Sequence, residues 1–334
     1  MYTKRVNPMI RISLIIFTYK RAILLEEVLK SIFKNFKNLS LPIYVIYHFD
    51  KNHHKSYLVI KKKWKSKNVI FYERRKISII NSFKYFLINP LNFFWILRWL
   101  DILKNWNSFK FLLEKVLRNI KTEYVTMVPD DQYFYNKTII SSRALEIISK
   151  NEKSYFYRFF TGDHFKGYNS LPKKLKIKFY KDKFAPFFEW SHKNSAFKKS
   201  PLWNYRFTIE GTVFHKNTLL KLISRFLYHN PITLEAIGLW ESRLRSFFSN
   251  GLSSKKRTAA GFQINSVQKH VFHRNNNFNT EILMKAYLKG YRLHINRSIF
   301  KRNNFDVVPD NIFFKKKNSI KISYKNLLVR LKSI

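Results

Sequence analysis

The chain has no cysteine among its 334 residues. Disulfide bonds, thiolate zinc sites and a cysteine nucleophile are therefore excluded. Only 7 glycines and 9 prolines occur, which argues against repeats of turn-rich β structure. The glycine-rich loop of a P-loop enzyme, Gly-x-x-x-x-Gly-Lys-Ser/Thr, is missing, and so is a dinucleotide-binding fingerprint.

Acidic residues are scarce. Aspartate and glutamate total 20, against 64 lysines and arginines, and the formal net charge is +44. A field of this sign attracts polyanions such as nucleic acid, anionic lipid or phosphorylated substrates. A nucleic-acid-binding protein is one interpretation, because aromatic and basic side chains are interleaved along the chain. No helix-turn-helix, zinc or ribonucleoprotein motif supports it, so we do not expect nucleic acid as a partner.

Long apolar runs are absent as well. The nearest case, Leu91 to Leu100, is shorter than the roughly 18 residues that a membrane-spanning helix needs, and it contains Arg98. The first residues are polar and basic, and no apolar segment with a cleavage site follows them. We therefore expect a cytoplasmic protein without a transmembrane helix.

The residues that are present predict an α/β fold. Hydrophobic residues make up 46% of the chain, which is ample for a core. Strand and helix patterns alternate over the first 76 residues, in segments 11–17, 24–36, 42–49, 55–64 and 68–72. Such alternation predicts a Rossmann-like, mostly parallel sheet flanked by helices.

Two adjacent carboxylates, Asp130 and Asp131, follow the apolar strand Tyr124 to Val128. Pro129 ends that strand because proline cannot donate to a sheet ladder. In open α/β sheets, ligands bind at the carboxyl ends of the strands, and Mg²⁺ or Mn²⁺ prefer carboxylate and phosphate oxygens. The pair is therefore either a metal site or a tight turn, for which Pro-Asp-Asp is suitable chemistry.

The stretches before this pair share a pattern with a known family. The run Ile12-Ser-Leu-Ile-Ile-Phe-Thr-Tyr-Lys-Arg21 precedes a helix, and a helix at 108–120 leads into Asp130 and Asp131. Their order and spacing resemble the family-2-like glycosyltransferases with the GT-A fold, in which a strand runs into Pro-Thr-Tyr-Asn-Arg and a later strand into Asp-x-Asp. Phe17 and Lys20 replace the proline and the asparagine of that family. The resemblance covers about residues 11 to 150.

This resemblance implies a nucleotide-sugar donor and a divalent ion, Mn²⁺ or Mg²⁺, that offsets the charge of the leaving diphosphate. Asp131 matches the second, metal-binding aspartate of the family. Pro129 stands where the first aspartate would be. Asp130 is then either a substitute metal ligand or a contact to the ribose.

The nucleotide contacts implied by the resemblance come from the ends of the first two strands. They are Thr18, Tyr19, Arg21 and Asp50. Asp50 would contact the base or the ribose, and its alternative role is that of an ordinary loop residue. Arg74 and Arg75, after the third strand, either contact phosphate or form a solvated basic turn.

The second half of the chain must supply the acceptor site and any catalytic base. An inverting transfer needs a carboxylate that deprotonates the acceptor hydroxyl. Few acids are available there, and the candidates are Glu210, Glu235 and Glu241. Glu210 precedes Gly211, which permits close backbone approach. Glu235 has the alternative role of a first-turn acid stabilised by a helix dipole, and Glu241 that of an exposed helix residue.

Two histidines, His270 and His273, could complete a metal site, although a satisfied or exposed histidine is the commoner case. We divide the chain into a nucleotide half at 1–150 with an insertion at about 77–107, an acceptor half at 151–300 and a basic C-terminal tail at 301–334. A mobile loop is expected between Lys166 and Lys199. The tail is expected to form a helical extension.

The sequence thus predicts a hexosyltransferase-type glycosyltransferase that extends a glycan or a polyprenyl-linked glycan, such as a bacterial lipopolysaccharide or capsule. A catalytically inactive protein with the GT-A fold is the alternative, given the altered aspartate motif. We also expect peripheral binding to the inner face of the cytoplasmic membrane, through the aromatic segment Leu91 to Trp106 and the basic tail from Lys315 to Ile334.

Overall fold

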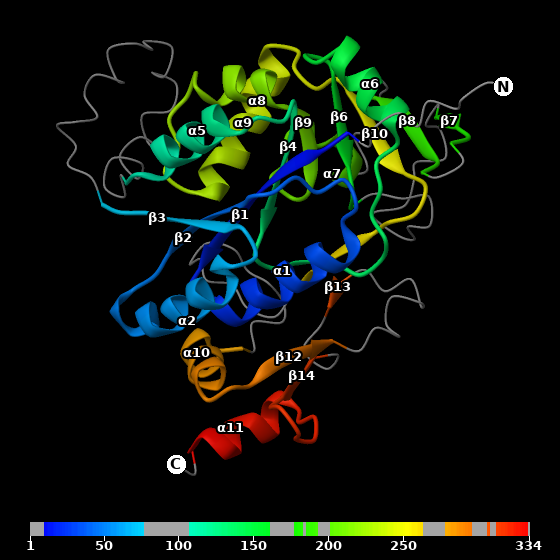
Figure 1. The fold of residues 1–334 in the computed structure, drawn as a ribbon. Coiled ribbons are helices and arrows are strands. Elements are labelled where there is room, and N and C mark those ends of the chain that lie inside the picture. Colours follow the sequence, from blue (N-terminus) through cyan, green and yellow to red (C-terminus); the bar gives the residue numbers. More distant parts are fainter. Residues whose placement is uncertain are drawn as a thin grey trace.

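The computed structural model describes residues 10–76, 107–160, 177–182, 185–192, 201–262, 278–295, 306–307 and 312–332. In these residues a nine-stranded sheet, in the order β3-β2-β1-β4-β9-β6-β10-β8-β7, has helices on both faces (Figure 1). All of its strands except β9 and β8 run in one direction, so the sheet is mixed but largely parallel. The α/β class predicted from the sequence is confirmed.

Four parallel neighbours, β3, β2, β1 and β4, form the first part of this sheet. The elements here are β1 (Ile12–Tyr19), α1 (Ala22–Asn35), β2 (Ile43–His48), η1 (Lys51–His53), α2 (His54–Lys65), β3 (Val69–Glu73), α5 (Phe109–Asn119) and β4 (Tyr124–Pro129). β1, β2 and β4 are nearly continuous apolar runs, as is usual for strands that are buried on both faces. The strand-helix alternation predicted for this region is confirmed, with shifts of a few residues at the ends.

The remaining strands of the large sheet mix directions. The elements here are β5 (Gln132–Phe134), α6 (Ser142–Lys150), β6 (Tyr155–Arg158), β7 (Lys178–Tyr180), β8 (Phe187–Ser191), α7 (Pro201–Asn204), β9 (Thr212–His215), α8 (Lys216–Ile223), α9 (Pro231–Leu244) and β10 (Asn250–Ser254). β9 lies between β4 and β6 and is antiparallel to both. β5 belongs to a second, three-stranded sheet with β11 (Ala259–Phe262) and β13 (Asp306–Val307).

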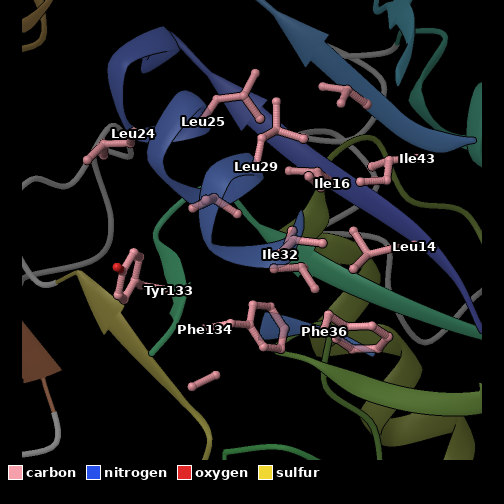
Figure 2. Packing of buried hydrophobic residues seen from close by; sticks show 14 of the residues in the cluster. Leu14, Ile16, Leu24, Leu25, Leu29, Ile32, Phe36, Ile43, Tyr133 and Phe134 are labelled. Atoms are coloured by element: carbon pink, nitrogen blue, oxygen red, sulfur yellow. The ribbon is translucent and has the colours of Figure 1, made fainter. Parts of the chain in front are cut away.

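The core lies on both faces of the large sheet, because successive side chains of a strand point to opposite sides. In β1, Leu14 and Ile16 pack beneath α1 in one cluster, as Figure 2 shows. Ile15 and Phe17 belong to the other cluster, together with residues of α5, α8 and α9. The strand ends are therefore held between two helical layers, which fixes the loops that follow them.

The prediction of a mobile loop between Lys166 and Lys199 is wrong in part. Lys178–Tyr180 and Phe187–Ser191 are the strands β7 and β8 of the large sheet. β7 is only three residues long, and its exposed lysine and phenylalanine hide the alternation that marks a half-buried strand. Residues 166–176, 183–184 and 193–199 of that segment lie outside the described residues, as do His270, His273 and the insertion up to residue 106.

The C-terminal segment lies beside α1 and α2, at the lower edge of Figure 1. Its elements are α10 (Thr280–Leu288), β12 (Arg292–Ile295), β14 (Ile312–Lys315) and α11 (Tyr324–Lys332). The helices expected at the end of the chain are present, and β12 and β14 form an antiparallel pair between them. The tail is docked on the core, since Leu327 is fully buried.

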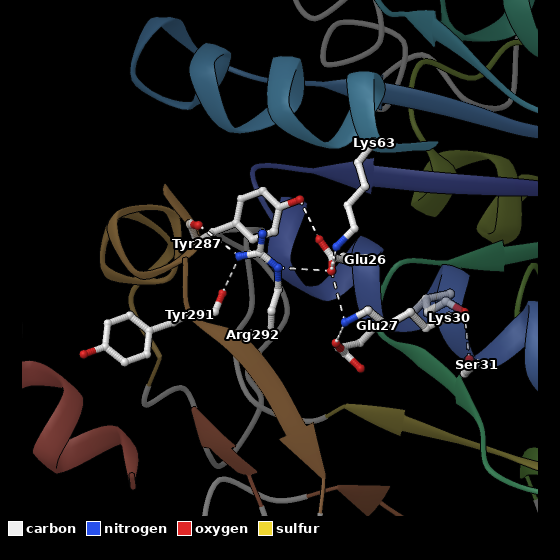
Figure 3. A network of polar contacts seen from close by, with 9 residues as sticks. Glu26, Glu27, Lys30, Ser31, Lys63, Tyr287, Tyr291 and Arg292 are labelled. Atoms are coloured by element: carbon white, nitrogen blue, oxygen red, sulfur yellow. Dashed lines mark hydrogen bonds and ion pairs between the residues drawn. The ribbon is translucent and has the colours of Figure 1, made fainter. Parts of the chain in front are cut away.

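A buried carboxylate joins this segment to α1 and α2 (Figure 3). Glu26 of α1 is fully buried and accepts hydrogen bonds from the Tyr287 hydroxyl at 2.7 Å and from Arg292 Nε at 3.1 Å. Lys63 of α2 approaches the same carboxylate at 2.6 Å and Lys30 at 3.0 Å. Burial alone would raise the pKa of Glu26, but these partners outweigh it and lower the pKa to about 2. Glu26 is therefore ionised and ties three parts of the chain together.

Candidate active site

The carboxyl ends of the four parallel strands meet at one edge of the sheet. The loops after them are tied together by backbone hydrogen bonds from Asp130 N–H to the Phe17 carbonyl at 2.9 Å, from Lys20 to His48 at 3.3 Å and from Arg74 to Tyr47 at 2.8 Å. The β1–β4 register pairs Phe17 with Pro129, which brings Thr18 level with Asp130. The structure therefore brings together the predicted residues of β1, β2 and β4.

Asp130 is the inner member of the aspartate pair. It is fully buried, its Oδ2 accepts a hydrogen bond from the Thr18 hydroxyl at 2.6 Å, and its Oδ1 pairs with Arg21. The Tyr57 hydroxyl lies 2.8 Å from the Thr18 oxygen and closes the network. Burial and the neighbouring Asp131 raise the pKa of Asp130 to about 6. The two oxygens of Asp130 thus face Arg21 and Thr18 in the interior.

Asp131 is the outer member and faces solvent. Its side chain is 30% exposed, and Oδ2 pairs with Arg21 Nη1 at 3.1 Å. Its Oδ1 makes no hydrogen bond or ion pair with the described residues. One free carboxylate oxygen beside a substrate diphosphate is a common way to hold Mg²⁺ or Mn²⁺. Where the chain is described, no group of three or more histidines and carboxylates could hold a metal.

Arg21 bridges the two aspartates. Burial works against its charge, but Asp130 and Asp131 outweigh burial and hold the pKa of Arg21 above its usual value. The guanidinium is therefore a permanent cation with both carboxylates as partners. It pairs with Asp130 through Nη2 and with Asp131 through Nη1, so one guanidinium neutralises the first and positions the second.

Asp50 and Tyr19 lie at the ends of β2 and β1. Asp50 Oδ2 pairs with Lys20 Nζ at 2.7 Å, and Oδ1 accepts from His53 N–H at 3.1 Å. These hydrogen bonds outweigh burial and keep the pKa of Asp50 below its usual range. The Tyr19 ring stacks on His48 with centroids 5.3 Å apart. The result is a flat aromatic surface beside a carboxylate that is 40% exposed.

The two arginines after β3 differ. Arg75 has a side chain that is 77% exposed, as a solvated turn would have. Arg74 is half-buried, and its guanidinium lies 5.8 Å from the centre of the Phe109 ring. Burial lowers the pKa of Arg74 to about 10, and no carboxylate among the described residues pairs with it. Arg74 is therefore the better candidate for a contact with phosphate.

A cavity of about 520 Å³ opens beside this edge. The end of β6, the loop before β9 and the first turns of α9 form its walls. Its lining residues are Arg158, Phe160, Tyr205, Thr208, Glu210, Ile232, Glu235, Ala236, Leu239 and Trp240. Two of the three glutamates singled out in the sequence thus line one cavity, and Glu241 instead pairs with Arg245 at 2.8 Å.

Glu210 reaches the cavity from the loop before β9. Gly211, which follows it, has a φ of +60° and donates a backbone hydrogen bond to the Met127 carbonyl at 2.9 Å. In the antiparallel β4–β9 pair, Met127 is the partner of Thr212, so Glu210 lies near the level where β4 ends. This brings Glu210 close to Asp131, although 79 residues separate them in the sequence.

Glu235 faces Glu210 from α9. The helix begins at Pro231 behind an Asn230 cap that accepts from Thr233 N–H at 2.8 Å, and its first turn has no acid. Glu235 lies in the second turn, so a first-turn dipole contact does not account for it. The Thr208 hydroxyl connects the two glutamates, because it hydrogen-bonds to Glu235 and accepts from Glu210 N–H at 3.1 Å.

The two carboxyl groups disfavour each other's charge. The exposed surface of Glu210 lies in the crowded cavity, where burial, Glu235 and Asp131 raise its pKa to about 8. Burial also raises the pKa of Glu235, while Thr208 and Arg158 act in the opposite direction. At neutral pH, Glu210 therefore favours its protonated form, and Thr208 and Arg158 oppose the effect of burial on Glu235.

Arg158 was missed in the sequence. It ends β6, is almost fully buried, and donates to the Tyr205 carbonyl. Burial lowers its pKa to about 10, although Glu210 and Glu235 favour its charge. A charged residue inside the aromatic run 155–160 is the signal that could have indicated it.

No family model matches the sequence, and no curated protein matches it. Among solved structures, the chain is similar to residues 1–349 of TarS from S. aureus, with 15% identity over 76% of this chain and 61% of that chain and a TM-score of 0.42. The same protein in complex with UDP-GlcNAc gives 14% identity, 84% and 65% coverage and a TM-score of 0.38. The mannosyltransferase PcManGT from Pyrobaculum calidifontis, in complex with GDP-Man and Mn²⁺, has 14% identity over 44% of this chain and 34% of that chain and a TM-score of 0.24. The chain thus spans less than two thirds of the length of these proteins.

Proposed function

We propose that this protein is a glycosyltransferase of the GT-A type, which moves a sugar from a nucleotide-sugar donor to a hydroxyl of a glycan acceptor. The observation that carries the proposal is the position of Asp131. It is a partly exposed carboxylate at the carboxyl edge of a largely parallel sheet, held by Arg21, and it lies beside a cavity that contains Glu210 and Glu235.

On the donor side, we assign the nucleotide to the loops after β1, β2 and β3. The stacked Tyr19 and His48 offer an aromatic face to a base, and Asp50 offers carboxylate oxygens to a ribose or a base. Arg74 would contact the diphosphate. Asp131 would hold Mn²⁺ or Mg²⁺, which when bound offsets the negative charge of the departing nucleoside diphosphate.

Asp130 and Thr18 have a supporting role in this proposal. Asp130 neutralises Arg21 in the interior, and Thr18 fixes the orientation of Asp130. The sequence predicts that Asp130, Thr18 and Arg21 contact the donor directly. We propose instead that these three residues position Asp131. Tyr19 and Asp50 keep the predicted contact with the nucleotide.

On the acceptor side, Glu235 is proposed as the general base. Burial raises the pKa of Glu235, while Thr208 and Arg158 favour its charged form, and such a carboxylate would accept the proton of an acceptor hydroxyl. Glu210, whose pKa is raised to about 8 in part by Asp131, would lie beside the sugar that is transferred. A base between the donor edge and an acceptor pocket is the arrangement that an inverting transfer needs.

The test is turnover of nucleotide sugars by the purified chain. UDP- and GDP-linked hexoses are incubated with and without about 1–10 mM Mn²⁺ or Mg²⁺, a range well above usual site affinities, and release of the nucleoside diphosphate is followed. Ion-dependent release from at least one donor is expected. If no donor gives release of the nucleoside diphosphate or ion-dependent nucleotide binding, the alternative of a catalytically inactive protein is favoured.

The wider setting is also proposed. We infer that the acceptor is a bacterial lipid-linked or surface glycan reached at the inner face of the cytoplasmic membrane. No helix in the described residues is long and apolar enough to cross a bilayer. Ile322 and Leu327 of the tail are buried in the core, so attachment would depend on the lysines of that segment. Co-sedimentation with anionic vesicles, lost at high salt, is the expected result, and equal binding to neutral vesicles would count against it.

A further inference from the structure

One stripe of α9 forms a wall of the cavity and continues beyond it. The residues of this helix that line the cavity follow helical spacing, and they are Ile232, Glu235, Ala236, Leu239 and Trp240. Residues three and four positions apart lie on the same face of a helix, so the next residue of the stripe is Arg243, which is exposed. Arg243 therefore lies at the rim of the cavity, next to Trp240 along the helix face.

A second arginine reaches this rim from the loop before β9. Arg206 follows Tyr205, which lines the cavity and is 39% exposed. The side chain of Arg206 is half-buried, and burial and the charge of Arg243 both lower its pKa. The two guanidinium groups are thus neighbours at one end of the cavity, although different segments of the chain carry them.

The histidine after β8 marks the same region. The buried imidazole of His192 stacks on Phe156 with centroids 5.8 Å apart. Burial, and then the charges of Arg158, Arg206 and Arg243, hold the pKa of His192 well below its usual value. Three arginines, from β6, from the loop before β9 and from α9, therefore converge on one part of the molecule.

The charges of these arginines are offset to different degrees. Glu210 and Glu235 favour the charge of Arg158. Burial and Arg243 instead disfavour the charge of Arg206. A half-buried cation beside another cation is stabilised when an anion lies between the two. Phosphate suits this position, because a planar guanidinium can bind two of its oxygens with parallel hydrogen bonds.

We propose that Arg206 and Arg243 form a binding site for a phosphate group of the acceptor, at the rim of the cavity. The proposal rests on the proposed function, in which Glu235 takes the proton of the acceptor hydroxyl, and it adds a charged group that the acceptor must carry. Eight residues of α9 take the helix from Glu235 to Arg243, a rise of roughly 12 Å. The phosphate would therefore lie about the length of a disaccharide from the reacting hydroxyl, with Trp240 beside the sugars between them.

Binding of methyl phosphate to the full chain tests the site without turnover. Titration calorimetry is performed in about 0.15 M salt, which screens the general attraction of a chain of net charge +44. Each variant also carries Arg74→Gln, so that the candidate phosphate contact of the donor edge does not contribute. Arg206→Gln and Arg243→Gln should each weaken binding about tenfold, as the loss of a charge-assisted hydrogen bond does.

Arg118→Gln is the matched control, since Arg118 is an arginine of α5 whose side chain is 62% exposed and does not line the cavity. It removes the same charge and should leave the affinity nearly unchanged. Arg243→Lys keeps the charge but loses the planar group, so its affinity should lie between those of the wild type and Arg243→Gln. If neither glutamine variant at the rim weakens binding more than Arg118→Gln does, the proposal is overturned.

The stability of Arg206→Gln gives a second measurement. In phosphate-free buffer this variant should unfold at the same urea concentration as the wild type or at a higher one, because it removes a charge that its surroundings disfavour. Saturating methyl phosphate should raise the midpoint of the wild type more than that of the variant. A variant less stable than the wild type without phosphate would give Arg206 a structural role and would count against the site.

A longer ester separates two sources of the phosphate, the glycan chain itself and the link to a lipid. Leu244 follows Arg243 and is 71% exposed, so it would lie beside the first carbons of a lipid. If octyl phosphate binds more tightly than methyl phosphate and Leu244→Ala removes this gain, the phosphate is that of a lipid-linked acceptor. In any other case it belongs to the glycan chain.

This inference and the proposed function can fail separately. A chain that binds methyl phosphate through both arginines but releases no nucleotide from any donor would end the proposed function and leave the phosphate site standing. A chain that turns over donors, but whose affinity for methyl phosphate depends on neither arginine, would keep the proposed function and end this inference.

Discussion

Arg21 contacts both aspartates that follow β4, and this shared contact separates their roles. Asp130 is fully buried and has Arg21 and Thr18 as partners. Asp131 shares the same guanidinium but keeps one oxygen toward solvent. Removing the outer carboxylate should therefore affect ligand chemistry, whereas removing the inner one should affect the stability of the site.

Asp131→Asn tests the outer role. Transfer should fall by at least about hundredfold, as is typical when one electrostatic contact to a reacting group is lost. The stability should change by less than about 0.5 kcal/mol, because the side chain is partly exposed and Arg21 keeps Asp130 as a partner. Donor turnover and urea denaturation measure the two effects. Turnover at the wild-type rate would exclude Asp131 as the metal ligand.

Asp130→Asn tests the inner role. It leaves the buried Arg21 with one partner fewer, and breaking a buried ion pair typically costs roughly 3–5 kcal/mol. Metal affinity measured in the presence of a nucleoside diphosphate should fall by only about 10–100-fold, the usual effect of a group that orients a ligand. A variant as stable as the wild type, but devoid of metal binding, would instead make Asp130 a direct ligand.

The sequence indicated the donor side better than the acceptor side. Asp131, Thr18 and Asp50 follow apolar strands, and the ends of parallel strands meet at one edge by geometry alone. Which of two adjacent aspartates is buried depends on Arg21, 109 residues earlier than Asp130, and no local pattern reveals that. Glu210 and Glu235 meet only because β9 lies beside β4 and α9 folds back over it.

At the scale of elements, the loop before β9 is shaped by Gly211. Its φ of +60° lies in the left-handed region, and a Cβ at this position would overlap the Phe160 ring. Gly290 has a φ of +86°, but a Cβ there would have open space around it. The two glycines therefore share a backbone requirement and differ in packing.

Gly211→Ala should consequently cost more than Gly290→Ala. The backbone strain common to both is on the order of 1 kcal/mol, and overlap with Phe160 should add about 1–3 kcal/mol at Gly211. Denaturant midpoints of the two variants measure the difference. Because Phe160 lines the cavity, sugar binding should also weaken in Gly211→Ala alone. Equal losses of stability would show that Phe160 moves aside freely.

Elements with strong periodic patterns were predicted, and those without were not. The apolar runs of β1, β2 and β4 and the amphipathic faces of α1 and α5 are visible in the sequence alone. β7 and β8 lie in a basic segment, and they become strands because β10 offers an edge to β8. Such pairing is a long-range effect that local propensity does not contain.

At the scale of the whole molecule, Glu26 holds the C-terminal segment against α1. This helix begins directly after Arg21, so the same helix connects the candidate site to α10 and β12. A fully buried carboxylate with four partners cannot be replaced without leaving buried donors unsatisfied. The contact therefore stabilises the molecule while lying away from the proposed chemistry.

Glu26→Gln should reduce the free energy of unfolding by roughly 3–5 kcal/mol, because Arg292 and two lysines lose their counter-charge. Glu146→Gln is the matched control, since Glu146 is 65% exposed and its pair with Lys150 is long at 4.0 Å. It should change stability by less than about 0.5 kcal/mol. Similar losses in both variants would mean that the Glu26 contacts add nothing beyond surface charge.

The dependence of stability on pH should show two opposing limbs. Glu26 has a pKa of about 2 in the folded chain against a usual 4.5, so its contribution is present above 4.5 and is lost as the pH falls toward 2. Glu210 has a pKa of about 8 against the same usual value, so its contribution is present below 4.5 and is lost as the pH rises through 8. Asp130, raised to about 6, acts in the same direction as Glu210.

Stability should therefore be greatest on the acidic side of neutral pH and should fall between about pH 5 and 9. Denaturant unfolding in about 0.5 M salt measures this, because salt screens the general repulsion in a chain of net charge +44. Glu210→Gln should flatten the alkaline limb and leave the acidic limb unchanged, whereas Glu26→Gln should do the opposite. Comparing each variant with the wild type removes the charge effects that all three share. An alkaline limb of equal slope in Glu210→Gln and the wild type would mean that Glu210 titrates normally and is ionised at neutral pH.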